Sequence, residues 1–370
     1  MARNLTLTLV VAAILLLGSL SLTRNRSASP QEIKIDALLC LSGDCAEWGE
    51  SALRGIQLAV EEQNDSGGLL GRRIALTVSD TKEATSGAAA VTAYRHLRAA
   101  TQAKLIIGPS WTPAGLSLAP IAAREDVLLI SPSLGVADFN ETAENLFNTW
   151  PHDEVGTRAL ASWAFAQGIR QAAILASDQP WEALQGRFFE EAFTEVGGTI
   201  MSHQRSPADS RDPRTEILRI MATRPEAVFL SSLGQMDVAA RELRSNGYRG
   251  LLIAPLVDET RLLAADGALE GAVTVRYAEA LPEFRERFRK RYGEEPGVAA
   301  ATAFDAARSY FHAIMMTNST EPRVLKTAYP QLAFEGASGL VRFDAAGAVQ
   351  RTPQIVRVVG SSVQQMEEVQ

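Results

Sequence analysis

The stretch IKIDALLCLSGDCAEWGESALRGIQLAVEEQNDSGGLLGRRIALTVSDT, residues 33–81, contains two apolar runs separated by an amphipathic segment. The runs 33–41 and 73–79 predict strands, and the segment 49–64 between them predicts a helix. The same alternation continues, with further strands expected near 104–107, 127–131, 172–176, 199–204, 227–231, 251–254 and 272–276. Strands that alternate with helices form parallel sheets with helices on both faces, so we expect an α/β fold.

The alternation falls into two similar halves. Residues 33–150 and residues 151–275 show a similar order of strands and helices, which predicts two similar doubly wound lobes. After Ala278 the pattern changes to helices near 282–292, 298–317 and 322–333, followed by strands near 339–344 and 353–360 joined by the turn AAGA. We therefore expect lobe 1 to comprise 33–149 plus 278–338, and lobe 2 to comprise 150–277 plus 339–362.

Length and charge restrict the class of protein. A chain of 370 residues, 46% of them hydrophobic, can bury a large core, and at this length two domains are expected. The formal net charge of −7 argues against nucleic acid as a partner, because there is no basic excess to neutralise phosphates. The basic cluster at 285–293 is interrupted by Phe and Glu at helical spacing, and we interpret it as a solvated helix face.

The N-terminus predicts export. After Arg3 the chain is uncharged through Leu22, and a polar segment rich in small residues follows. That order is typical of a secretory signal peptide within residues 1–30, with the mature chain starting between about residues 22 and 31. An uncleaved membrane anchor is the alternative, since the run approaches the ~20 residues that a bilayer span needs. Both interpretations place the rest of the chain outside the cytoplasm.

Two cysteines, Cys40 and Cys45, are close together in the sequence. In an oxidising compartment they would close a small disulfide loop, and otherwise Cys40 would be a buried strand residue and Cys45 a free loop thiol. The sequence leaves both alternatives open, because the pairing depends on the distance between the two Cα atoms. Their spacing excludes a CxxC redox or zinc motif.

The expected strand ends are the places to look for a site, because open α/β sheets bind ligands at the carboxyl ends of their strands. In LIIGPSWTPAG, residues 105–115, Thr112 and Pro113 predict a helix start with Thr112 as N-cap. A helix N-terminus with an adjacent hydroxyl attracts an anion such as a carboxylate. The next expected strand ends in LLISPSLGVADF, residues 128–139, whose turn would lie beside the first in a parallel sheet.

The segments 33–81 and 105–133 resemble the Leu/Ile/Val-binding protein family, the type I periplasmic solute-binding proteins of ABC importers. The resemblance extends over roughly residues 33–360, and its most specific parts are NDSGGLLGRRI and the turns before Thr112 and Ser133. It implies two lobes joined by a three-segment hinge that close on a small ligand, an amino acid or a related carboxylate or amide. It also implies a monomer that works with the membrane subunits of an ABC importer, without nucleic acid, metal or cofactor.

The resemblance also implies a ligand-binding site. Thr112, with Ser110 and Trp111 in the same turn, corresponds to the hydroxyl that holds the ligand carboxylate. Ser133 corresponds to the carbonyl that meets the ammonium group. The full set of expected site residues is Trp48, Ser110, Trp111, Thr112, Ser133, Leu134, Gly135, Trp181, Leu233, Leu256 and Asp258.

Three of these positions depart from the family pattern. Gly135 and Leu233 replace a common threonine and a common tyrosine, and Leu256 replaces the acid that pairs with an ammonium group. Asp258 or Glu259 are candidates to replace that acid. An ammonium group needs such a partner, because burying a charge without one is costly.

The sequence gives little support for catalysis. A Gly-x-Ser-x-Gly motif does not occur, and the four histidines are scattered without the spacing of metal ligands. His152 and Asp153 are adjacent, and we interpret them as an exposed histidine beside a helix-capping aspartate. We expect a solute carrier, with a ligand-sensing receptor module of the same fold as the alternative.

Overall fold

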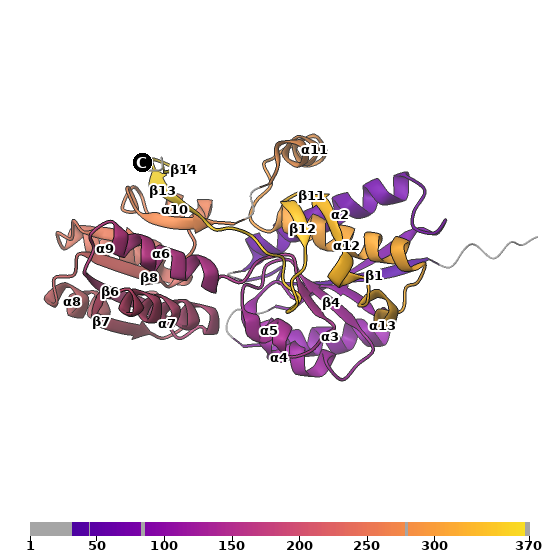
Figure 1. Cartoon of the computed structure of the whole chain (residues 1–370), viewed down its shortest axis with the longest axis horizontal. Coiled ribbons are helices and arrows are strands. Elements are labelled where there is room, and N and C mark those ends of the chain that lie inside the picture. The colour runs from indigo at the N-terminus through magenta and orange to yellow at the C-terminus, as the bar shows by residue number, and fades with distance from the viewer. Residues whose placement is uncertain (1–31, 44, 83–85, 278–279, 367–370) are drawn as a thin grey trace, which may run out of the picture.

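The computed structural model describes residues 32–43, 45–82, 86–277 and 280–366. Two α/β lobes lie side by side along the long axis of the molecule (Figure 1). The expected fold class, two similar doubly wound lobes, is confirmed. Residues 1–30, for which the sequence predicts a signal peptide, lie outside the described residues.

Lobe 1 is built on a parallel five-stranded sheet in the order β2-β1-β3-β4-β5. Its strands are β1 (Ile33–Leu39), β2 (Ile74–Asp80), β3 (Leu105–Ile107), β4 (Leu128–Ser131) and β5 (Leu146–Asn148). The helices that connect them are α2 (Ala46–Asp65), α3 (Ala88–Thr101), α4 (Thr112–Ala122) and α5 (Ala137–Glu141). Along β1, Ile33, Ile35, Ala37 and Leu39 pack into one buried apolar cluster, and Leu38 packs into another.

Lobe 2 repeats this order. Its sheet runs β14-β13-β10-β9-β8-β6-β7, so the parallel part β7-β6-β8-β9-β10 matches lobe 1 strand for strand. The strands are β6 (Gln171–Ser177), β7 (Thr199–Ser206), β8 (Ala227–Ser231), β9 (Leu251–Ile253) and β10 (Val273–Arg276), with antiparallel β13 (Gln354–Val359) and β14 (Ser362–Gln365) added at the edge. The helical segments are α6 (Glu154–Ala166), α7 (Pro180–Glu195), α8 (Arg214–Ala222), η1 (Leu233–Gln235), α9 (Met236–Ser245) and α10 (Glu259–Ala264).

The segment after β10 returns to lobe 1. It forms α11 (Pro282–Tyr292), α12 (Ala300–Thr317), α13 (Pro322–Leu325), η2 (Tyr329–Gln331), β11 (Ala333–Gly336) and β12 (Gly339–Arg342). Phe284, Phe304 and Tyr310 of this segment join the buried cluster that contains Ile33 and Ile35. The chain therefore crosses between the lobes after β5 and again between β10 and α11.

The third crossing lies later than predicted. β12 pairs with β11 and not with β13, and Val341, Phe343 and Val349 pack into the lobe 1 core. The backbone of Val349 donates a hydrogen bond to the Asn148 carbonyl at 2.9 Å. The expectation that residues 339–349 belong to lobe 2 is thus wrong, and the chain crosses between Val349 and Gln354, where it runs from one lobe to the other in yellow in Figure 1.

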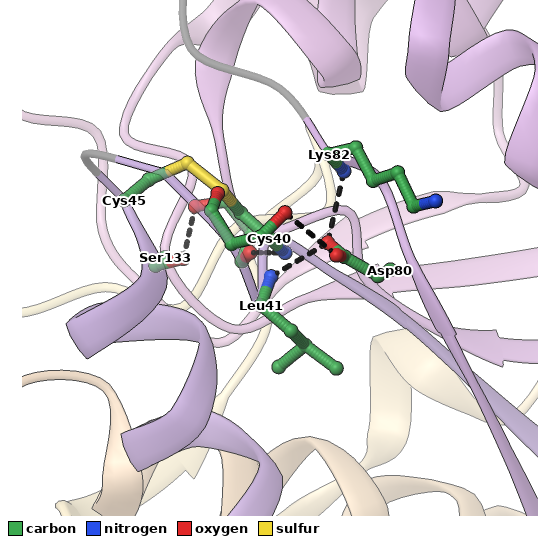
Figure 2. The surroundings of a disulfide bond; sticks show 8 residues. Cys40, Leu41, Cys45, Asp80, Lys82 and Ser133 are labelled. Atoms are coloured by element: carbon green, nitrogen blue, oxygen red, sulfur yellow. Dashed lines mark hydrogen bonds between the residues drawn. A yellow bond between two sulfur atoms is a disulfide. The ribbon is translucent and has the colours of Figure 1, made fainter.

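Cys40 and Cys45 form a disulfide, with their Cα atoms 5.8 Å apart. It closes the loop between β1 and α2, as Figure 2 shows. Asp80, at the end of the neighbouring strand β2, accepts hydrogen bonds from the backbone of Leu41 at 2.8 Å and from the Ser42 hydroxyl at 2.7 Å. The disulfide holds Cys40 and Cys45, and the Asp80 hydrogen bonds hold Leu41 and Ser42. These contacts fix the start of the segment that leads to Trp48.

Candidate functional site

A cavity that is partly open to solvent lies between the two lobes. Side chains from both lobes and from the first crossing line it. Lobe 1 contributes Trp48, Ser110, Trp111, Thr112 and Ser133, the crossing contributes Trp150 and Asp153, and lobe 2 contributes Gln179, Trp181, Leu233 and Leu256. Eight of the residues expected from the sequence are thus brought together in one cavity.

The lining residues follow matching strands of the two sheets. In lobe 1 they come after β1, β3 and β4, and in lobe 2 they come after β6, β8 and β9. These strands hold equivalent places in the two sheet orders. Each lobe therefore presents the carboxyl ends of its strands to the cavity, where α/β sheets bind ligands.

The turns after β3 and β4 lie side by side, as the sequence predicted. β3 pairs with β4 in parallel, and the Ser133 hydroxyl donates a hydrogen bond to the Ser110 carbonyl at 2.8 Å. The Ser131 hydroxyl joins the same turns by donating to the Pro109 carbonyl at 2.7 Å. The Ser110 hydroxyl in turn accepts from the backbone of Cys40 at 2.9 Å. Three strand ends of lobe 1 are thus joined by hydrogen bonds around the cavity.

Thr112 lines the cavity but does not cap α4. Trp111, in extended backbone conformation, occupies the N-cap position, and no side-chain cap hydrogen bond is made there. The helix begins at Thr112, one residue earlier than predicted, and Pro113 follows inside the first turn, where a missing N–H costs nothing. Among the described residues no hydrogen-bond partner of the Thr112 hydroxyl is found, so this hydroxyl is available to a ligand.

The lobe 2 wall is held by a buried carboxylate. Gln179 caps α7 through its side-chain oxygen, which accepts from the Trp181 backbone at 2.7 Å. The Glu182 carboxylate accepts from the Leu233 backbone N–H at 2.7 Å, and burial raises the pKa of this carboxyl. Arg261 donates to the Leu233 carbonyl at 2.8 Å. Trp181 and Leu233 are therefore fixed relative to each other.

Asp153 is the ionisable group of the cavity. Its two carboxylate oxygens accept hydrogen bonds from two indoles, Trp150 Nε1 at 2.9 Å and Trp181 Nε1 at 2.7 Å. Its side chain is buried, and this desolvation raises the pKa of the carboxyl to about 7 against the opposing effect of the two hydrogen bonds. Among the described residues that line the cavity, Asp153 alone has an ionisable side chain.

Three predicted site residues lie outside the cavity lining. Leu134 is fully buried in the apolar core, and its backbone N–H donates to the Ser131 hydroxyl at 3.0 Å. Gly135 lies behind Asp153 and accepts a hydrogen bond from its backbone at 2.8 Å. Asp258 caps α10 through the Arg261 backbone at 2.9 Å and forms an ion pair with the Arg261 guanidinium. The Asp258 carboxylate is therefore already paired with a cation of its own helix.

Sequence reasoning missed Trp150, Asp153 and Gln179. Asp153 occupies the N-cap position of α6, as interpreted, but its carboxylate makes no cap hydrogen bond and bonds to indoles in the cavity instead. His152 is half-buried and not exposed, and its Nε2 lies 2.9 Å from Asn140 Oδ1. The one available signal was the position of Trp150 and Asp153 at an expected crossing between lobes.

The family model described as periplasmic binding protein matches residues 32–362. The chain belongs to this family. Periplasmic binding proteins are solute-binding proteins and not enzymes, as the sequence predicted, and the family places the protein in the periplasm.

This periplasmic binding protein is similar to relatives of known name. Leu/Ile/Val-binding protein homolog 8 of Brucella abortus is 22% identical over 336 residues, covering 83% of this chain and 82% of the relative. A leucine binding protein from Thermotoga maritima has a TM-score of 0.81 at 22% identity, with 90% of this chain and 98% of that one covered. A solute binding protein from R. palustris in complex with benzoate also has a TM-score of 0.81, at 20% identity over 91% and 96% of the two chains.

Neither a metal-binding cluster nor a membrane-spanning helix is found in the described part of this periplasmic binding protein. No group of three or more His, Cys, Asp or Glu side chains there could hold a metal ion. Within the same part of the chain, helices fall short of the length and apolar character that a membrane span requires.

Proposed function

We propose that this protein captures a small ligand, an amino acid or a related carboxylate or amide, between its lobes and delivers it to an ABC importer. The observation that carries the proposal is the cavity enclosed by matching strand ends of both lobes. Small-molecule sites occur preferentially at boundaries between domains, as this cavity does.

The polar groups of the cavity suit a ligand with separated charges. The Thr112 hydroxyl at the start of α4, together with the helix N-terminus, provides hydrogen-bond donors and a positive dipole for a carboxylate. Asp153 provides the negative charge that a positively charged group requires when it is buried. The tryptophans and Leu256 supply apolar surface for the rest of the ligand.

Contacts between the lobes support closure around a ligand. The Thr260 hydroxyl of lobe 2 donates to the Glu47 carboxylate of lobe 1 at 2.7 Å, and Trp48 Nε1 lies 3.4 Å from Asp258 Oδ2. Polar contacts of this kind can open and close, and relative motion is the default for two lobes joined by crossing segments. Residues 1–30 act in this proposal as the signal peptide, and the mature protein works as a monomer.

A ligand screen tests the proposal. Thermal shift of the mature protein over amino acids, amides and small carboxylates should identify at least one stabilising ligand, since ligands that bind only the native state raise its melting temperature. Small-angle X-ray scattering should then give a smaller radius of gyration with that ligand than without it. A screen without any stabilising compound, or an unchanged radius, would contradict the proposal. Mass spectrometry of the N-terminus after export checks cleavage between residues 22 and 31.

A further inference from the structure

Four tryptophans, Trp48, Trp111, Trp150 and Trp181, line the cavity, and we refer to them as the tryptophan cage. The rings of Trp48 and Trp111 meet edge to face with centroids 5.8 Å apart, and those of Trp48 and Trp150 are 6.4 Å apart. Trp181 completes the cage from lobe 2. A ligand in the cavity would therefore contact indole rings from both lobes and from the first crossing.

The indole N–H groups of three of these tryptophans form hydrogen bonds with carboxylates. Trp150 and Trp181 donate to the two oxygens of Asp153, and Trp48 lies within hydrogen-bond distance of Asp258. With their N–H groups engaged, these rings have their π faces and apolar edges left to contact a ligand. The face of an aromatic ring carries negative potential, and tryptophan attracts cations more strongly than the other aromatic side chains.

The charge of the cavity also favours a cationic ligand. Asp153 is buried against Trp150 and Trp181, and no Lys, Arg or His side chain is among the described residues that line the cavity. A buried carboxylate without a cation nearby is costly, because its charge is removed from water. A cationic ligand would supply the positive charge that a buried, ionised Asp153 needs as a partner.

The available acceptors favour a cation without N–H groups. Each Asp153 oxygen already accepts one indole N–H, which leaves one acceptor site on each oxygen, and the Gln179 oxygen accepts from the backbone N–H groups of Trp181 and Glu182. A primary ammonium group brings three donors, each of which needs an acceptor when it is buried. A methylated ammonium group brings none, and its methyl groups can contact the indole faces and Leu233.

We infer that the ligand class is a small methylated ammonium compound, with the quaternary nitrogen held in the tryptophan cage beside Asp153. In a betaine, the carboxylate then faces the Thr112 hydroxyl at the start of α4. This inference rests on the proposed function and narrows its ligand class.

Isothermal titration calorimetry with two compounds of the same shape tests the inference. Glycine betaine and 3,3-dimethylbutyrate share a carboxylate and three methyl groups, but only the betaine carries a positive charge. We expect glycine betaine to bind about 100-fold more tightly or better, since a desolvated cation over several indole faces beside a carboxylate gains more than the neutral group. Equal affinity of the two compounds would overturn the inference.

Substitutions test which side chains bind the cationic group of the betaine. Trp48→Leu should weaken betaine binding by roughly tenfold, whereas Trp48→Phe, which keeps a π face, should lose less. Asp153→Asn should weaken binding of the betaine and leave that of 3,3-dimethylbutyrate unchanged or improved. Trp163→Leu, on α6 and outside the cavity lining, is the matched control and should bind betaine as wild type does. If Trp163→Leu lost as much betaine affinity as Trp48→Leu, the assignment of the tryptophan cage would be overturned.

Leucine serves as the third ligand and separates the two proposals. If leucine binds and closes the lobes more effectively than betaine, the inference fails while the solute-binding proposal stands. If no compound of the wider screen binds, both fail.

Discussion

The absence of a side chain at Gly135 provides the space that the Asp153 carboxylate occupies. A Cβ atom added at residue 135 would overlap Asp153 Oδ2 and the rest of that carboxyl group. The backbones of the same two residues are joined by a 2.8 Å hydrogen bond from Asp153 to the Gly135 carbonyl. Gly135 therefore sets the position of the Asp153 carboxylate. That carboxylate in turn accepts the hydrogen bond from the Trp150 indole, three residues earlier in the sequence.

We predict that Gly135→Ala lowers both ligand affinity and stability. The new methyl group must displace the buried Asp153 carboxyl, and overpacking of this kind costs about 1–3 kcal/mol of unfolding free energy. Chemical unfolding measures the stability, and calorimetry with the best ligand from the screen measures the affinity. The control is the same substitution in an Asp153→Ala background, where the overlap no longer exists and the further loss of stability should fall below about 0.5 kcal/mol. Additive losses in the double variant would contradict the proposed overlap.

The raised pKa of Asp153 predicts a pH dependence of stability. In the unfolded chain this carboxyl ionises near 3.8, whereas in the ligand-free native state it keeps its proton up to about 7. Between these values the native state holds more protons, so its stability falls as pH rises, by a total of up to about 4 kcal/mol. Above about pH 7 both states are ionised and this contribution no longer changes.

The measurement compares unfolding free energies of wild type and Asp153→Asn from pH 4 to pH 8. Burial raises the pKa of Asp305 to about 6, and that group is common to both proteins, so its effect cancels in the difference. Of the neighbours, Tyr277 has a pKa raised far above this range, and burial lowers the pKa of His152. A difference that stays constant from pH 4 to pH 7 would show that Asp153 is ionised normally.

Thr112 should affect binding and not helix stability. Because Trp111 and not Thr112 occupies the N-cap position, Thr112→Ala should cost about 1 kcal/mol of stability or less. Loss of a hydrogen bond to a charged ligand group should cost roughly 1.5–3 kcal/mol of binding, or about one to two decades in affinity. Thr112→Ser keeps the hydroxyl and should bind within a few-fold of wild type. Unchanged affinity in the alanine variant, measured by calorimetry, would remove Thr112 from the site.

The disulfide should stabilise both the fold and the position of Trp48. Replacing Cys40 and Cys45 by serine should lower the unfolding free energy by about 2 kcal/mol, the value expected for so short a loop. Affinity should fall as well, because Cys45 directly precedes α2 and Trp48 lies in its first turn. Guanidinium chloride unfolding with and without dithiothreitol provides the control: the reductant should destabilise wild type and leave the double variant unchanged. Equal sensitivity of both proteins would rule out this role.

The sheets were largely predictable, because their buried strands are apolar runs bounded by turns and helices. β5 (Leu146–Asn148) was missed because, unlike the three-residue strands β3 and β9, which are wholly apolar, it ends in a polar Asn. The third crossing was misplaced because a short strand such as β12 does not reveal its partner in its own sequence, and here the partner is β11.

The site was predictable where residues follow strand ends, as Ser110, Thr112 and Ser133 do. Asp153 was not, because an aspartate before a helix has the same local sequence whether it caps the helix or turns away from it. Its indole partners, Trp150 and Trp181, belong to different elements, so only the folded chain shows the contact. The disulfide between Cys40 and Cys45 likewise could not be decided from the sequence, because it depends on the distance between the two Cα atoms, which is 5.8 Å in the folded chain.

The location of Asp153 has a mechanical consequence. Asp153 lies in the first crossing, and its carbonyl accepts a 2.9 Å hydrogen bond from the hydroxyl of Tyr277, which follows β10 at the second crossing. The same hydroxyl accepts from the backbone of Gly156 at 3.0 Å. In the proposed closure, a ligand bound to the Asp153 carboxylate therefore acts beside the crossings about which the lobes rotate. A small displacement at these crossings then moves the far rims of the lobes much further, so binding in the cavity changes the outer surface of the protein.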